Sequence, residues 1–147
     1  MGEALRQARL AYENDEVPIG AVIVREKKII ARAHNQVERL KDATAHAEMI
    51  ALTQAAHAVG DWRLTGCTLF VTKEPCPMCA GALTLARVDR VVFAVRDEKS
   101  GGAGTVFNIP AHGGLNHIVT VTAGLKESEA RELLKTFFRA KRSTPPA

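Results

Sequence analysis

The chain has 147 residues, of which 46 % are hydrophobic and 24 % charged, with a formal net charge of +4. This length predicts one domain spanning residues 1–147, large enough to bury roughly two-thirds of its unfolded surface. No apolar run has the length of a membrane span, segment 1–18 lacks the apolar block of a signal peptide, and three cysteines do not make a disulfide scaffold. We therefore expect a cytoplasmic protein without a membrane anchor.

The first part of the chain predicts a helix, a hairpin and a second helix. Residues 4–12 place their apolar side chains on one helical face. The β-rich runs 18–24 and 28–34 are separated by the charged turn REKK, which predicts a β-hairpin. The polar stretch NQVERLKDAT then predicts a loop, and we expect a helix from about Ala45 with Thr44 as its N-cap.

The second part predicts alternating strands and helices. Strands are expected at 67–72, 90–95 and 117–123, with a helix at 77–87 between the first two. A final helix carries an apolar stripe of Ala130, Leu133, Leu134, Phe137 and Phe138. A short strand-helix-strand unit implies a right-handed crossover with parallel pairing, whereas the opening hairpin is antiparallel. The predicted fold is therefore α/β, a three-layer α/β/α sandwich around a mixed sheet of about five strands.

The stretch TKEPCPMCAG contains two cysteines, Cys76 and Cys79, at the point where a strand gives way to a helix. At this spacing both sulfurs can reach one ion, and a helix N-terminus favours the thiolate that binds metal. Pro77 suits the first helical turn, where its missing N–H has no cost. Taken alone, the motif is equally typical of a redox pair.

A second motif, TAHAEM, supplies the partners that a redox pair would not need. His46 can join Cys76 and Cys79 in one metal site if it lies at the mouth of its helix, before regular helical geometry begins. Three protein ligands with one open position indicate a catalytic zinc rather than a structural one, because Cys67 reads as a core residue. Glu48 then remains as the carboxylate that a proton shuttle requires.

H-x-E followed by P-C-x-x-C is the signature of zinc-dependent nucleobase deaminases. The chain further resembles the bacterial tRNA-specific adenosine deaminases through EVPIGAV, AHN, TAHAEM, WRL, LFVTKEPCPMCAGAL, RVVFAVRDEKSG, NH and FFRAKR, in order from about Glu16 to Arg142. The resemblance implies a cytidine deaminase-like fold, one Zn²⁺ per subunit and a homodimer.

It also implies hydrolytic deamination of adenosine to inosine at the wobble position of a tRNA anticodon, chiefly in an arginine tRNA. In that reading a zinc-activated water attacks the base, and Glu48 moves the protons. The backbone N–H of Ala47 and the side chain of Asn35 match the family's positions for holding the base. Asn35 could otherwise serve as a turn residue.

Further matches concern the RNA beyond the base. Asp97 would accept a hydrogen bond from a ribose 2′-hydroxyl, and Lys99 would lie near phosphate. Phe138, Arg139 and Arg142 on the final helix would complete the RNA surface, although basic helix ends and charged loops are often merely solvated. Lys73 departs from the family pattern, which usually has an apolar residue or cysteine there; it could touch RNA or extend to solvent.

Two alternatives remain open at the level of sequence. A free-base deaminase of the same fold, of the guanine type, also carries a run similar to PCPMC. A zinc-stabilised RNA-binding module without catalysis would bind anticodon stem-loops equally well after Glu48→Gln and would make no inosine.

Overall fold

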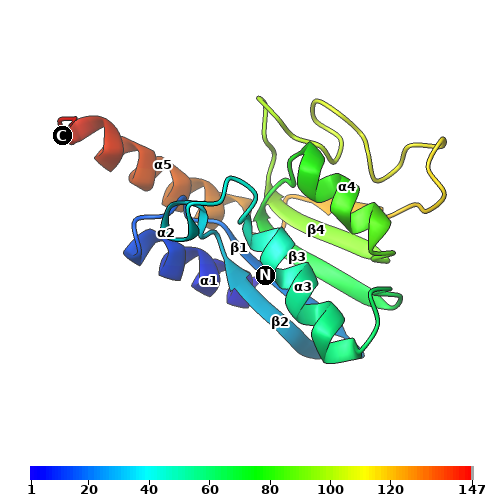
Figure 1. Cartoon of the computed structure of the whole chain (residues 1–147). Helices are drawn as coiled ribbons and strands as arrows, with labels where there is room; N and C mark the ends of the chain where they lie inside the picture. The colour runs from blue at the N-terminus through cyan, green and yellow to red at the C-terminus, as the bar shows by residue number, and fades with distance from the viewer. Residues whose placement is uncertain (147) are drawn as a thin grey trace.

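The computed structural model describes residues 1–146. In chain order its elements are α1 Gly2–Glu13, β1 Gly20–Arg25, β2 Lys28–His34, α2 Val37–Leu40, α3 Ala47–Val59, β3 Cys67–Lys73, α4 Pro77–Leu85, β4 Arg90–Val95, β5 Thr120–Ala123 and α5 Glu127–Ser143 (Figure 1). Over these residues the strands form a five-stranded sheet in the order β2-β1-β3-β4-β5. β1 pairs antiparallel with β2 and β3, whereas β3–β4 and β4–β5 are parallel. The predicted mixed sheet is confirmed.

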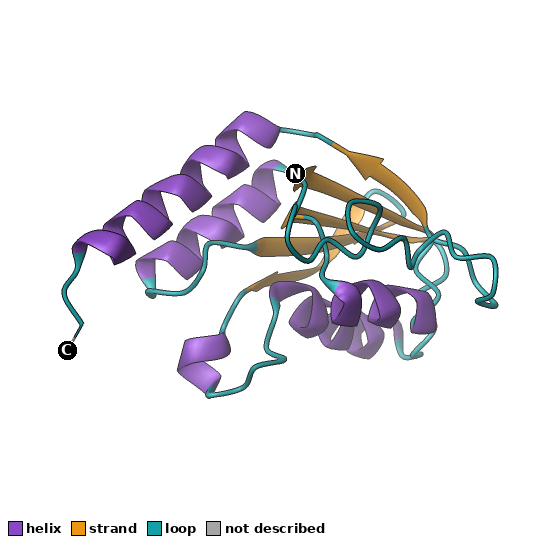
Figure 2. Ribbon diagram, turned by 90° about the horizontal axis from the view of Figure 1, so that it is seen from above, coloured by secondary structure: helices purple, strands orange, loops and turns teal. Residues whose placement is uncertain are grey.

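Helices cover both faces of the sheet, which confirms the three-layer prediction. α3 and α4 lie on one face, and α1 and α5 lie on the other (Figure 2). The main core joins the sheet to α3 and α4 through fully buried side chains such as Ile23, Leu69, Leu83, Val91 and Phe93. A smaller cluster that includes Leu5, Ala130 and Leu134 packs α1 and α5 against the opposite face.

The β1–β2 hairpin turns through Glu26 and Lys27, whose φ angles are 50° and 63°. Two successive positive φ angles produce a turn whose twist matches that of the strands it joins. On the sheet face that α1 and α5 cover, α1 approaches β1 so closely that a Cβ at Gly20 would collide with the carbonyl oxygen of Ala4. Glycine is thus required for this contact between helix and strand.

Two elements depart from the sequence-based expectation. The stretch expected to be a polar loop contains the short helix α2, whose first N–H groups bind the distant carboxylate of Glu16. The last strand begins at Thr120 instead of residue 117, because the His117 ring bonds to the Val88 carbonyl at 2.8 Å and the Val119 N–H to the Pro110 carbonyl at 2.9 Å. Both differences come from long-range hydrogen bonds.

None of the helices formed by residues 1–146 combines the length and apolar character needed to cross a membrane.

Candidate functional site

His46 lies at the mouth of α3, as its proposed role requires. It is the N-cap residue, with extended backbone angles (φ −70°, ψ 151°), and the helix begins at Ala47. The expectation that Thr44 caps the helix is wrong, because its hydroxyl and its N–H both bind the Asp42 carboxylate, at 2.7 and 2.8 Å. Because the backbone of His46 is extended, its imidazole points away from the axis of α3 and toward α4.

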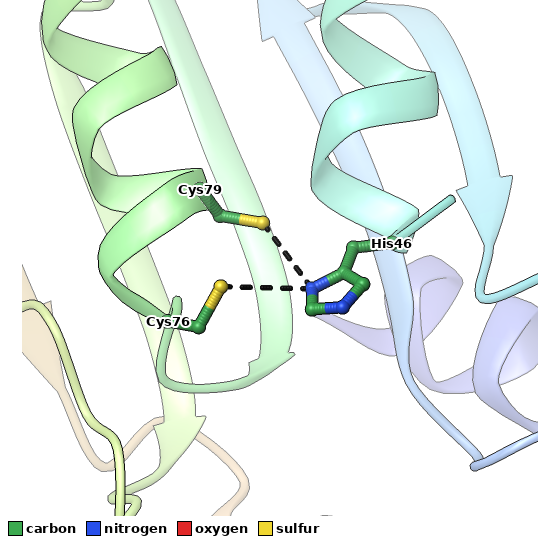
Figure 3. Close-up of side chains that lie close together, drawn as sticks. All are labelled: His46, Cys76 and Cys79. Atoms are coloured by element: carbon green, nitrogen blue, oxygen red, sulfur yellow. Dashed lines mark hydrogen bonds between the residues drawn. The ribbon is translucent and has the colours of Figure 1, made fainter. Parts of the chain in front are cut away.

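The two thiols come from the N-terminus of α4, which faces that of α3 (Figure 3). Cys76 is the N-cap residue of α4, Pro77 occupies the first turn, and Cys79 follows within it. The Sγ atoms of Cys76 and Cys79 lie 3.6 and 3.5 Å from Nδ1 of His46. The ligand atoms of the three residues all lie within 4.8 Å of one another. Two helix N-termini that are far apart in sequence thus bring one nitrogen and two sulfurs together.

Without an ion, hydrogen bonds within the triad favour one thiolate, on Cys76. The hydrogen bond from the Cys79 thiol is the main cause that lowers the pKa of Cys76 to about 4. The same bond raises the pKa of Cys79, and the bond to Cys76 raises that of His46. The Cys76 thiolate therefore lies between two proton donors, Cys79 and His46. A bound ion would displace the protons of both donors. One imidazole nitrogen and two thiolates form a soft, three-ligand set suited to zinc with one open position.

Beside the triad is a small pocket of about 180 Å³, into which Asn35, Ala47 and Glu48 all face together with His46. Glu48 lies in the first turn of α3 and is only 4 % exposed. Burial raises the pKa of its carboxyl group, which is the direction needed by a group that accepts and returns a proton. Because first-turn N–H groups have no partner within a helix, the N-terminus of α3 can also offer the Ala47 N–H to a ligand.

A larger groove of about 760 Å³ runs between the segment after β4 and the helix α5. It contains all five residues predicted to contact RNA beyond the base, namely Asp97, Lys99, Phe138, Arg139 and Arg142. Its charged lining is strongly basic, with seven cationic side chains against two acidic ones. Phe137 is buried, as the apolar stripe predicts, whereas Phe138 of the same stripe is 41 % exposed. Surface potential and an exposed aromatic ring are the features that attract nucleic acid.

Within this groove Asp97 is held by its own loop. Its carboxylate accepts hydrogen bonds from the N–H groups of Lys99 and Ser100, at 3.0 and 3.2 Å, and from the Ser100 hydroxyl at 2.9 Å. Lys73 forms an ion pair with the same carboxylate at 3.2 Å. These hydrogen bonds and the cation together lower the pKa of Asp97 despite partial burial. Lys73, the departure from the family pattern, therefore lies on the groove wall.

Two buried carboxylates at the site are not predicted from the sequence. Glu74 is 3 % exposed and accepts backbone N–H bonds from Asp97, Ala103 and Thr105 at 3.0–3.2 Å, together with the Thr105 hydroxyl. It thereby ties segment 97–105 to the strand end that leads into Cys76. The second, Glu16, is 1 % exposed and reaches both Asn35 and α2.

The third cysteine takes a structural place. Cys67 is fully buried in the main core, and burial raises the pKa of its thiol.

Comparison with known proteins agrees with this geometry. The MafB19-like deaminase family matches residues 1–142. The chain is 48 % identical over 147 residues to a tRNA-specific adenosine deaminase of Bacillus subtilis, covering 100 % of this chain and 91 % of the relative. It is 50 % identical over 140 residues to the tRNA-specific adenosine deaminase of Aquifex aeolicus, covering 95 % and 92 %.

Solved structures are similar along nearly the whole fold. A structure from a study of A-to-I editing by tRNA:A34 deaminases superposes with a TM-score of 0.88 at 43 % identity, covering 91 % of this chain and 97 % of the other. A guanine deaminase from Nitrosomonas europaea superposes with a TM-score of 0.79 at 29 % identity, covering 92 % and 81 %. The guanine-type alternative thus shares the fold at lower similarity.

Proposed function

The chain belongs to the family of tRNA-specific adenosine deaminases, and we propose that it converts adenosine to inosine at the wobble position of a tRNA anticodon. The observation that carries this proposal is the joint presence of the metal-ligand triad, the pocket with Glu48 and the basic groove. We further propose that residues 1–147 act as one deaminase domain, that the enzyme is a cytoplasmic homodimer, and that an arginine tRNA is its chief substrate.

His46, Cys76 and Cys79 would hold one Zn²⁺, since a nitrogen and two sulfurs within 4.8 Å of one another suit its tetrahedral preference. When bound, the ion would supply a Lewis acid that activates water for attack on C6 of adenine. Glu48 would take one proton of the attacking water and deliver it to N1 of the base, and would then carry the remaining hydroxyl proton to the C6 amino group, which leaves as ammonia. The Ala47 N–H and the Asn35 side chain would hold the base in the pocket.

The basic groove would take the backbone of the flanking nucleotides. In an anticodon loop the target base is unpaired, so moving it into the pocket costs little stacking energy. We propose that Arg139 and Arg142 contact phosphates while Lys99 lies near them, and that Phe138 offers a stacking surface.

Removing a phosphate contact should reduce the salt dependence of RNA binding. The logarithm of the association constant for an anticodon stem-loop falls linearly with the logarithm of the salt concentration. We expect Arg139→Ala and Arg142→Ala each to make this negative slope shallower by about 0.7–0.9. Fluorescence anisotropy over a salt series measures this slope. Lys28→Ala, which removes an exposed cation from β2, is the matched control and should leave the slope unchanged. Equal slopes in all four proteins would contradict the proposed path of the RNA.

Asp97 is expected to contribute to the choice of RNA over DNA. Asp97→Asn should weaken the hydrogen bond that residue 97 accepts from a ribose 2′-hydroxyl. The ratio of activity on an RNA stem-loop to activity on a DNA stem-loop should therefore fall, with bound zinc unchanged. Inosine formation on both oligonucleotides gives this ratio. An equal loss of activity on RNA and DNA would assign Asp97 only to the order of its own loop, where Lys99 and Ser100 already bind it.

The test of the proposed function is inosine formation in an anticodon stem-loop with a wobble adenosine, measured alongside zinc content. Ammonia release from free guanine without RNA is the parallel assay, because guanine deaminases share the fold. Inosine from the stem-loop and no ammonia from guanine would support the proposal. The opposite pair of results, from a zinc-loaded protein, would replace tRNA with a free nucleobase as substrate.

A further inference from the structure

We propose that Glu16 is a positioning residue of the deaminase site, which sets the orientation of the Asn35 amide in the base pocket. The inference rests on the proposed function. Glu16 lies in the segment between α1 and β1, and it lines the same pocket as Asn35, Ala47 and Glu48. Its side chain is 1 % exposed and takes no part in the chemistry assigned to the other residues.

The Glu16 carboxylate acts as an external cap for α2. The N-cap residue of this short helix, Gln36, makes no capping bond with its own side chain. Instead, Glu16 accepts the N–H of Glu38 at 3.1 Å and that of Arg39 at 2.7 Å. These are first-turn donors, which have no partner within a helix. One buried carboxylate thus satisfies two first-turn donors of the helix that follows Asn35.

The same carboxylate restricts the Asn35 side chain. The amide nitrogen of Asn35 lies 3.5 Å from Oε2 of Glu16. Both carboxylate oxygens of Glu16 accept backbone N–H groups, so an acceptor faces Asn35, and the amide turns its NH₂ group toward it. The backbone of Asn35 is fixed as well, since its N–H binds the Ile19 carbonyl at 3.0 Å. The donor and the acceptor that Asn35 offers to a base are therefore set by a residue that need not touch the base.

Glu16→Gln keeps the shape of this side chain but replaces one acceptor oxygen with a donor. If the remaining oxygen stays with Arg39, the new NH₂ group replaces Oε2, so the Glu38 N–H loses its acceptor and a donor faces Asn35. The Asn35 amide can then reverse, which exchanges donor for acceptor toward the base. We expect kcat/KM for inosine formation in an anticodon stem-loop to fall at least about tenfold, as for the loss of a hydrogen bond to a charged group. Zinc content should stay unchanged. Asp15→Asn, which removes the neighbouring exposed carboxylate, should keep wild-type activity.

A double-mutant cycle separates positioning from a merely structural role. If Glu16 acts through Asn35, the combination of Glu16→Gln with Asn35→Ala should be no less active than Asn35→Ala alone. Two independent tenfold losses would instead multiply to about a hundredfold and would overturn the proposal. Wild-type activity in Glu16→Gln would overturn it too. A wild type that makes no inosine would remove the proposed function, and the role of Glu16 with it.

If Glu16→Gln alone does not accumulate as folded protein, the exchange variant Glu16→Gln with Asn35→Asp provides the test. It restores a donor opposite an acceptor between the two side chains, so we expect it to fold and to bind zinc. Because the pocket then meets the base with a carboxylate in place of an amide, we expect inosine formation to remain at least about tenfold below wild type. Wild-type activity in this folded variant would show that the amide of Asn35 does not matter.

Discussion

Glu48→Ala should lower the rate of inosine formation by about 10²- to 10⁴-fold while the protein still binds one zinc ion per chain. We propose this pocket carboxylate as the proton acceptor, and His46, Cys76 and Cys79 could hold the ion without it. The variant should also unfold at the same temperature as wild type or a higher one, because a buried carboxyl group is costly to desolvate. The measurements are single-turnover inosine formation, zinc content and a thermal melt.

Two control variants make this result specific. Glu48→Gln keeps the shape of the side chain and should lose activity to a similar extent, whereas Glu132→Ala, which removes an exposed carboxylate of α5, should lose none. A loss of zinc in Glu48→Ala would mean that the carboxylate supports the metal instead of the proton transfer. Full activity with zinc bound would remove Glu48 from the mechanism altogether.

The sequence predicts the fold and the metal triad because both are encoded in local patterns. Period-two and helical apolar patterns place the strands and the main helices, and the parallel β3–β4 pair follows from a short crossover. The spacing of Cys76 and Cys79 and the need for a third ligand lead to His46 from the sequence alone. The reasoning that His46 must precede regular helical geometry is confirmed by its extended backbone.

The residues that the sequence does not predict all depend on long-range hydrogen bonds. Glu16 and Glu74 are acidic residues at the ends of apolar strands, a place where a buried carboxylate is unusual. Their partners, however, lie about twenty to thirty residues further along the chain, so no local pattern identifies them. The helix α2 is not predicted for the same reason, since its cap is Glu16. A charged residue next to a β-strand and a proline is the signal that could have drawn attention to both.

Alanine variants of the three cysteines test the proposed metal site, because two of the cysteines are candidate ligands and the third is a core residue. Cys76→Ala and Cys79→Ala should each lose zinc and nearly all inosine formation, because neither variant retains three protein ligands. Cys67→Ala should retain both, since Cys67 lies in the core and burial is the main cause that raises its pKa. Its thermal midpoint should fall by only a few degrees, as for a small cavity. Zinc content, activity and a melt on all three variants give the comparison.

Removal of zinc from the wild type should have a thermodynamic effect as well as a catalytic one. A ligand present at about 1,000 times its Kd adds about 4 kcal/mol to the free energy of unfolding, which corresponds to about 10 °C in a domain of this size. Chelation should therefore lower the melting temperature of wild type and of Cys67→Ala by this amount, and leave Cys76→Ala almost unchanged. Because the triad joins the N-termini of α3 and α4, an equal shift in all three proteins would mean that the stabilising ion binds elsewhere.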